Sequence, residues 1–227
     1  MVTATNPSPS PWTPAAVRDA IAVIAITDDL RDGVDGLVAR ARAAERGGMT
    51  MLQVRLKQAT SRELLRVTRA LVGALRVPVV VNDRVDIAIV GGAAGAHVGS
   101  SDLPVALARR LAPPGFLIGA SLTHAGELVD LDDADYAGVG PLFGTPSKTD
   151  AAPPTGIEGG AQLARLAARP CVAIGGVDAE NAEAIVRAGF DGVSVIRAVL
   201  SQPDPERAAH ALRDAVDVGR RSRGTAA

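Results

Sequence analysis

The chain has 227 residues and a formal net charge of −1, a length that suits one large α/β domain or two small ones. The near-zero charge argues against a general nucleic-acid-binding protein, because such a protein needs a basic surface. Hydrophobic residues make up 47% of the chain but aromatic residues only 2%, so we expect an aliphatic, alanine-rich core.

The chain lacks the marks of a secreted or membrane protein. Cys171 is the single cysteine, which excludes an intramolecular disulfide and a cysteine-based zinc cluster. It lies in an apolar run, so we interpret it as a buried small side chain rather than a nucleophile. No window approaches the roughly 18 uninterrupted apolar residues of a membrane span. Residues 1–14 lack the basic start and apolar region of a secretory signal. The sequence therefore predicts a cytoplasmic protein with a mobile tail over residues 1–20.

Eight apolar, β-branched runs alternate with eight segments of helical period between residues 21 and 219. The predicted strands are 21–27, 49–56, 77–81, 95–99, 116–122, 136–143, 171–174 and 192–196. The predicted helices are 35–46, 61–75, 85–91, 105–111, 125–131, 158–168, 179–188 and 204–219, and residues 220–227 form a frayed tail.

This alternation predicts parallel strands joined by helical crossovers. Eight units in about 200 residues match a single (β/α)₈ TIM barrel at the short end of its usual length. A doubly wound open sheet is the alternative. That fold normally carries a G-x-G-x-x-G fingerprint after its first strand, and residues 27–30 (TDDL) do not provide one. We therefore predict one barrel domain over residues 21–219.

The carboxyl ends of barrel strands form the active-site face, so polar residues at these ends are candidate site residues. Gln53, Arg55 and Lys57 alternate at the end of the second strand, which points all three to the same side. The candidates at the other strand ends are Asn82, Asp83, Asp102, Ser121, Thr145, Ser147, Lys148, Gly175, Gly176, Ile196 and Arg197.

The chemistry of these candidates divides into two parts. Arg55, Lys57 and Lys148 are cations at the same open end of the predicted barrel. A bound polyanion would relieve their mutual repulsion. Asp83 and Asp102 supply the hard oxygen ligands that Mg²⁺ takes together with substrate phosphates. These residues predict a metal-bound diphosphate. The Gly-Gly turn and the end of strand eight predict a second, simpler phosphate site.

Each candidate also has a structural alternative. Asp83 and Asp102 could cap the helices that follow them, Arg55 and Lys57 could be salt-bridged strand ends, and the glycine pair could be only a tight turn. The hydroxyl-and-lysine loop at 145–148 could be an ordinary surface loop. Among the histidines, we expect His97 to serve packing or to support neighbouring site residues, His124 to be a possible catalytic residue, and His210 to be exposed on a late helix.

Seven segments together resemble the thiamine phosphate synthase family and its sister family, the thiazole tautomerases, over residues 22–212. They are 53–57 (QVRLK), 82–86 (NDRVD), 97–102 (HVGSSD), 119–121 (GAS), 138–148 (GVGPLFGTPSK), 173–176 (AIGG) and 192–198 (GVSVIRA). The sequence departs from the family pattern at Leu56, where an acidic residue is usual, and at Ser100, Ser147 and Arg197.

The resemblance implies a (β/α)₈ transferase that joins a hydroxymethylpyrimidine diphosphate to a thiazole phosphate and releases pyrophosphate with Mg²⁺. It implies a dissociative mechanism, in which pyrophosphate leaves before the thiazole nitrogen attacks the resulting carbocation. It also implies small-molecule substrates, with no nucleic-acid or membrane partner and a possible homo-oligomer. The alternatives are a thiazole tautomerase, which needs no metal, and a non-catalytic thiazole-phosphate-binding protein.

The resemblance assigns roles residue by residue. The pyrimidine diphosphate would be held by Gln53, Arg55, Lys57, Asn82, Ser121 and Lys148, of which Arg55, Lys57, Ser121 and Lys148 would be catalytic. Mg²⁺ would be held by Asp83 and Asp102. The thiazole phosphate would be held by Thr145, Ser147, Gly176, Ile196 and Arg197.

Overall fold

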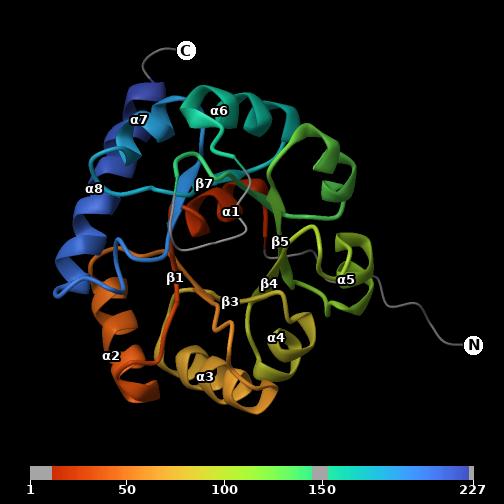
Figure 1. Ribbon diagram of the computed structural model, residues 1–227, viewed down its shortest axis with the longest axis vertical. Coiled ribbons are helices and arrows are strands. Elements are labelled where there is room, and N and C mark those ends of the chain that lie inside the picture. Colours follow the sequence, from red (N-terminus) through yellow and green to blue (C-terminus); the bar gives the residue numbers. More distant parts are fainter. Residues whose placement is uncertain (1–11, 145–152, 225–227) are drawn as a thin grey trace, which may run out of the picture.

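The computed structural model describes residues 12–144 and 153–224, and the strands in these ranges form a closed parallel barrel (Figure 1). Each strand pairs with the next along the chain, and β8 returns to pair with β1. This closure confirms the predicted (β/α)₈ barrel and excludes the doubly wound open sheet. The strands are β1 Val23–Ile26, β2 Met51–Val54, β3 Val79–Asn82, β4 Gly95–Val98, β5 Leu117–Leu122, β6 Tyr136–Val139, β7 Cys171–Ile174 and β8 Gly192–Val195.

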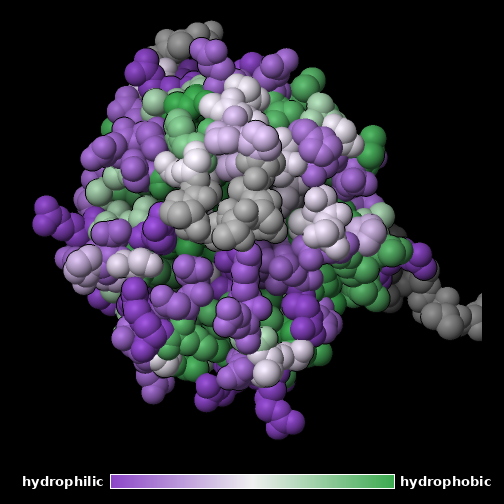
Figure 2. Space-filling view, in the orientation of Figure 1, coloured by the Kyte–Doolittle hydropathy of each residue, from purple (hydrophilic) through white to green (hydrophobic). Residues whose placement is uncertain are grey.

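All the described helices but the first form a ring outside the barrel (Figure 1). The described helices are α1 Pro14–Ala20, α2 Gly33–Arg46, α3 Ser61–Ala74, α4 Val85–Gly91, α5 Val105–Leu111, the 3₁₀ helix η1 Ala125–Leu131, α6 Gly156–Ala167, α7 Ala182–Arg187 and α8 Pro205–Gly224. None of the described helices is both long and apolar enough to cross a membrane. The face seen in Figure 1 is largely hydrophilic, with hydrophobic residues in patches toward the outer helices (Figure 2).

Strand alternation produces a core of two layers. Inward side chains such as Ile24, Met51 and Leu117 fill the barrel itself. Outward side chains pack against the helix ring, where small residues such as Ala41 on α2 and Ala164 on α6 let helix and sheet approach closely. The predicted aliphatic core is confirmed, because Tyr136 and Phe190 are the only aromatic residues among the largest fully buried side chains described.

The amino end of the barrel is closed by α1, so the predicted tail was wrong for residues 14–20. Thr13 caps this helix by accepting a hydrogen bond from the Ala16 amide (3.2 Å), and Pro14 occupies its first turn. Val17 and Ile21 are buried in the inner barrel cluster. The Trp12 indole donates to the Gly115 carbonyl (2.9 Å), just before β5 begins. These contacts hold the segment against the barrel.

The carboxyl-terminal tail was also predicted too early, because α8 continues to Gly224. Arg220 donates to the Arg18 carbonyl (2.6 Å), and Arg223 donates to the Phe190 carbonyl (2.7 Å). Long arginine side chains therefore tie the last turns of the helix to the body of the protein.

Some element boundaries differ from the prediction. β6 ends at Val139 rather than at residue 143, ahead of the cis peptide bond Gly140-Pro141. α3 begins at Ser61 as predicted, and Thr60 caps it in a reciprocal capping box with Glu63. The Asp178 carboxylate accepts hydrogen bonds from the Glu180 and Asn181 amides, which builds a turn there and delays α7 to Ala182.

Candidate active site

A cavity of about 750 Å³ opens at the carboxyl ends of the strands. Every predicted site residue within the described ranges lines it. These residues are Gln53, Arg55, Lys57, Asn82, Asp83, Asp102, Ser121, Gly176, Ile196 and Arg197. The prediction that alternation points Gln53, Arg55 and Lys57 to one side is confirmed. Thr145, Ser147 and Lys148 lie outside the described residues.

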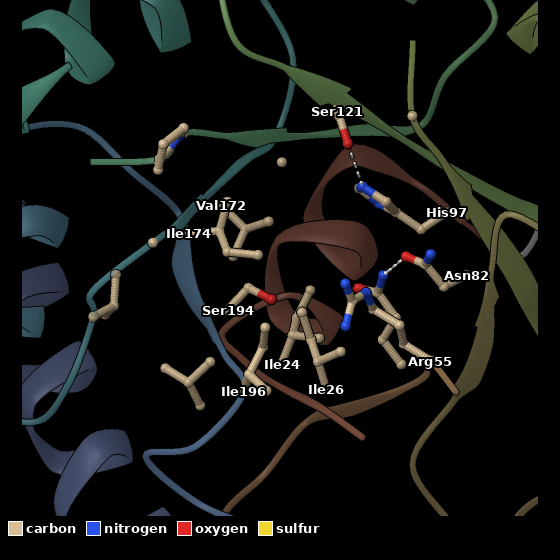
Figure 3. A pocket seen from close by; sticks show the side chains of 18 of the residues that line it. Ile24, Ile26, Arg55, Asn82, His97, Ser121, Val172, Ile174, Ser194 and Ile196 are labelled. Carbon is tan, nitrogen blue, oxygen red and sulfur yellow. Dashed lines mark hydrogen bonds between the residues drawn. The ribbon is translucent and has the colours of Figure 1, made fainter. Parts of the chain in front are cut away.

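The cavity has two walls of different chemistry (Figure 3). One wall, from β2 to β5, presents polar side chains such as Arg55, Asn82 and Ser121. The facing wall comes from β1, β7 and β8 and is mainly aliphatic, and its labelled aliphatic members are Ile24, Ile26, Val172, Ile174 and Ile196. A bound molecule would therefore meet charge and hydrogen-bonding groups on one side and a hydrocarbon surface on the other.

Polar side chains adjoin one another along the polar wall. The Gln53 amide donates to Asn82 Oδ1 (2.5 Å). Asp83 follows Asn82 in the chain, and its carboxyl lies near that of Asp102. Desolvation raises the pKa of Asp83 to about 6, and the neighbouring Asp102 carboxyl adds to the effect. Asn82 and the charge of Arg55 act in the opposite direction. Two carboxyl groups thus adjoin in the cavity, where Asp83 is exposed and Asp102 is half-buried.

Asp83 adopts a backbone conformation that side-chain-bearing residues rarely use. Its φ is 63°, its amide donates to the His97 carbonyl (2.8 Å), and the Arg84 amide donates to the Asn82 carbonyl (2.7 Å). A left-handed conformation at a non-glycine residue costs about 1–3 kcal/mol and is concentrated at functional sites. The conformation aims the Asp83 carboxyl into the cavity instead of along the next helix.

The helix-cap interpretation of the two aspartates is wrong. α4 has Arg84 at its N-cap and α5 has Pro104, and neither helix receives a side-chain cap bond. Asp102 instead accepts a hydrogen bond from the Gly99 amide (2.8 Å), within the loop after β4. Both aspartates therefore line the cavity and do not cap the helix that follows them.

Arg55 is positioned by two residues that sequence reasoning did not single out. The buried Thr27 hydroxyl accepts from the Arg55 amide (2.8 Å) and donates to the Arg55 carbonyl (3.0 Å). The Arg55 guanidinium lies 3.7 Å from the Asp28 carboxylate, and its side chain is only 13% exposed. Strand pairing across β1 and β2 brings these groups together, so their separation in the sequence hides the contact.

Ser121 belongs to a partly buried polar group with His97 and Tyr136. His97 Nε2 lies 3.2 Å from the Ser121 hydroxyl, and His97 Nδ1 lies 3.3 Å from the Tyr136 hydroxyl. Burial raises the pKa of Tyr136, so the phenol keeps its proton. The two ring nitrogens of His97 link Tyr136 to Ser121. His97 thus packs inside the barrel and supports Ser121, as predicted, and it also lines the cavity.

Two glycines make room for these rings. A Cβ atom on Gly119 would lie 2.2 Å from Cζ of Tyr136, and one on Gly138 would lie 3.0 Å from Cε1 of His97. The first distance is impossible for any residue but glycine at that position. The aromatic ring of Tyr136 therefore occupies the volume that a side chain of β5 would otherwise fill.

The ends of β7 and β8 form a second corner of the cavity. Gly175 and Gly176 have φ values of 95° and 67°, and a Cβ on Gly176 would lie 2.6 Å from Cβ of Phe143. The backbone there is open to the cavity without an intervening side chain, beside Ile196 and the exposed Arg197. Exposed backbone at this place in a barrel is typical of a phosphate site.

Two other residues considered in the sequence have structural roles. His124 caps η1, where its Nδ1 accepts from the Gly126 amide (3.1 Å), and it does not line the cavity. We therefore assign it no part in catalysis. Cys171 is buried, and desolvation raises the pKa of its thiol to about 12, which confirms that it is not a nucleophile.

The fold is a (β/α)₈ barrel with a cavity at the carboxyl ends of its strands, which is where enzymes of this fold have their active sites. A family model described as thiamine monophosphate synthase matches residues 23–199. The chain belongs to this family, and its activity is that of a thiamine-phosphate synthase, a transferase.

Proteins similar to this chain match it over most of their own length. A thiamine-phosphate synthase of Albidiferax ferrireducens is 41% identical over 203 residues, which is 87% of this chain and 93% of that protein. One from Laribacter hongkongensis is 44% identical over 189 residues, 80% and 88% of the two chains. The solved structure of a thiamine phosphate pyrophosphorylase from Pyrococcus furiosus superposes with a TM-score of 0.78 at 32% identity, covering 89% of this chain and 98% of that one.

Proposed function

We propose that this site condenses 4-amino-2-methyl-5-hydroxymethylpyrimidine diphosphate with thiazole phosphate, and that the diphosphate binds against the polar wall. The observation that carries the proposal is the pair of adjoining carboxyl groups, Asp83 and Asp102, beside the cationic side chains of Arg55 and Lys57 in one cavity. Cations bind a diphosphate directly, whereas carboxylates bind it only through a metal ion. A thiazole tautomerase would have no diphosphate to neutralise and no use for the carboxylate pair.

The carboxylate pair fits Mg²⁺. Asp83 and Asp102 repel each other when both are ionised, which contributes to the raised pKa of Asp83, and a divalent cation would relieve that repulsion. Within the described ranges no three His, Cys, Asp or Glu side chains gather closely enough to hold a metal on their own. Mg²⁺ usually takes one or two protein carboxylates and completes its shell with phosphate oxygens and water. When bound, it would neutralise charge on the departing pyrophosphate.

The pyrimidine ring would be recognised by the amides of Gln53 and Asn82. Their mutual hydrogen bond uses the nitrogen of Gln53 and the oxygen of Asn82, and it fixes both amide planes. Gln53 is left with an acceptor oxygen and Asn82 with its amide hydrogens. An aminopyrimidine edge carries an amino donor beside a ring-nitrogen acceptor, so it is complementary to this pair.

The protein's own contribution would be electrostatic and positional. Arg55 and Lys57 would stabilise the negative charge that develops as the carbon–oxygen bond breaks and pyrophosphate leaves. Lys148, which lies outside the described residues, would add a third cation. Ser121, held by His97, would position the donor. The thiazole nitrogen then attacks the pyrimidine carbocation with its own electron pair, so no general base is needed, and holding both partners together supplies much of the acceleration.

The acceptor phosphate would bind in the second corner of the cavity, at Gly176, Ile196 and Arg197. The open glycine backbone and the nearby guanidinium suit a phosphate monoester. Thr145 and Ser147, outside the described residues, would complete this corner. The ring of the acceptor would then lie against the aliphatic wall, opposite the donor.

A coupled assay of the full chain tests the proposal. Purified protein, pyrimidine diphosphate and thiazole phosphate are mixed, and pyrophosphate is followed with and without Mg²⁺. We expect metal-dependent release of pyrophosphate that requires both substrates. Absence of metal-dependent release would contradict the proposal, and binding of thiazole phosphate without turnover would instead indicate a binding protein.

A further inference from the structure

Among the described residues, five polar side chains are buried, and one of them differs from the rest. The five are Thr27, Gln53, Thr68, Glu127 and Ser194. Thr27 and Gln53 bond Arg55 and Asn82 as described above. Thr68 donates to the Leu64 carbonyl (2.8 Å), and Glu127 accepts from Thr123. Ser194 is only 4% exposed, and its hydroxyl has no hydrogen-bond partner within residues 12–144 and 153–224.

Ser194 is in the middle of the aliphatic wall. Its backbone pairs with Ile24 on β1 and with Ile174 on β7, and its side chain lines the cavity. Figure 3 shows its hydroxyl oxygen turned toward the centre of the cavity, across from Arg55 and Asn82. The surrounding wall is hydrocarbon, so an alanine would serve the packing equally well. Arg40 Nε is the one fully enclosed side-chain polar atom without a partner among the described residues, so the Ser194 oxygen is open to the cavity and available to a molecule bound there.

We propose that the Ser194 hydroxyl is a recognition point for the heteroaromatic ring of the acceptor. The inference rests on the proposed function, which assigns Gly176, Ile196 and Arg197 to the acceptor phosphate. Ser194 lies on β8, two residues before Ile196 and facing the same way. An acceptor whose phosphate is held at the strand ends would place its ring deeper, against Ile24, Ile174 and Ser194. The donor ring has its own polar partners on the opposite wall.

The reaction changes the charge of this ring. The ring nitrogen gives its electron pair to the new carbon–nitrogen bond while pyrophosphate leaves with the pair of the broken carbon–oxygen bond, so the acceptor ring becomes a cation. A serine hydroxyl can rotate, so its oxygen can face a ring that carries positive charge. In a hydrocarbon wall this single dipole acts in a low dielectric and is screened little by water. Ser194 would therefore contribute to both binding and reaction of the acceptor.

The test is Ser194→Ala in the full chain, with KM measured separately for the two substrates. We expect KM for thiazole phosphate to rise about 3- to 10-fold, the effect of one neutral hydrogen bond, and KM for the pyrimidine diphosphate to stay within about twofold. The melting temperature should stay the same or rise, because the variant loses no protein–protein hydrogen bond. Thr68→Val is the matched control: it removes a buried hydroxyl away from the cavity, and it should lower the melting temperature while leaving both KM values unchanged.

Calorimetric binding of thiazole phosphate alone separates the failure of this inference from the failure of the proposed function. Weaker binding to Ser194→Ala than to the unmodified chain supports the inference even where no pyrophosphate is released. Equal binding and equal KM for thiazole phosphate in both proteins overturn it, and so does a change confined to KM for the pyrimidine diphosphate.

Discussion

The two ends of the barrel differ in how far their side chains find favourable partners within the protein. At the amino end, α1 covers the inner cluster with Val17 and Ile21, and the Trp12 indole bonds a carbonyl. At the carboxyl end, two carboxyl groups adjoin, and Asp83 has a left-handed backbone. The amino end stabilises the fold. The carboxyl end keeps an unfavourable backbone conformation and closely spaced charges that serve binding. Substitutions at the two ends should therefore change different measured quantities.

Asp83→Asn should have the largest effect on turnover. It removes a proposed metal ligand, and we expect kcat/KM to fall by roughly 10³-fold or more, since a metal contributes several kcal/mol to charge stabilisation. Asparagine tolerates the left-handed conformation and removes the repulsion with Asp102, so the melting temperature should not fall. Asp86→Asn, at an exposed residue paired with Arg84, is the control and should retain activity. A variant that lost only thermal stability would contradict the metal-site assignment.

Ile21→Ala should have the largest effect at the amino end. Ile21 is fully buried beneath the barrel, so truncation should lower the free energy of unfolding by about 2–5 kcal/mol, measured by urea denaturation. Both KM values should be unchanged in protein that remains folded. Ile21→Val should cost only about 0.5–1.5 kcal/mol. A marked change in KM in either variant would show that the two ends are coupled.

Thr27→Val should have an intermediate effect on the site through Arg55. Valine has nearly the shape of threonine but leaves the Arg55 amide and carbonyl without their hydroxyl partner. We expect kcat/KM for the pyrimidine diphosphate to fall about tenfold, equivalent to about 1.4 kcal/mol, with a smaller change for the acceptor. Thr27→Ser keeps the hydroxyl and should recover most of the loss. If serine fails to recover it, the methyl group of Thr27 rather than its hydroxyl positions Arg55.

Trp12→Phe should have the smallest effect. It keeps an aromatic ring against the barrel but removes the donor to the Gly115 carbonyl, so we expect a loss of about 0.5–1.5 kcal/mol in unfolding free energy. Steady-state kinetics should be unchanged. A change in KM larger than the stability effect would mean that α1 influences the site.

The barrel was predictable because every repeat carries a local pattern. Apolar runs and helical periods were enough to locate every strand of the barrel to within a few residues. The helix α1 was missed although Thr13 followed by Pro14 is a typical helix start, because a Ser-, Thr- and Pro-rich context was interpreted as a tail. What holds α1 is the burial of Val17 in the barrel and the bond of the preceding Trp12 to Gly115, and local patterns contain no information on such remote contacts.

The site was predictable only where strand alternation and strand ends decide it. Alternation placed Gln53, Arg55 and Lys57 correctly, and position after a strand placed Asp83 and Asp102. Thr27 and Ser194 were missed because they lie inside apolar runs. The signal was available in part, since Ser194 is a hydroxyl at an inward position of a buried strand. Which residues meet across the barrel depends on the register of neighbouring strands, which the sequence does not state.

The close approach of Gly119 to Tyr136 has an evolutionary consequence. The two residues are register partners on β5 and β6, and the ring of one fills the place of a side chain on the other. Neither position can change alone. A larger residue at 119 is tolerated only together with a smaller one at 136, and a smaller residue at 136 leaves a void beside His97. We expect related sequences to vary these two positions together or not at all, so that the pair is inherited as a unit.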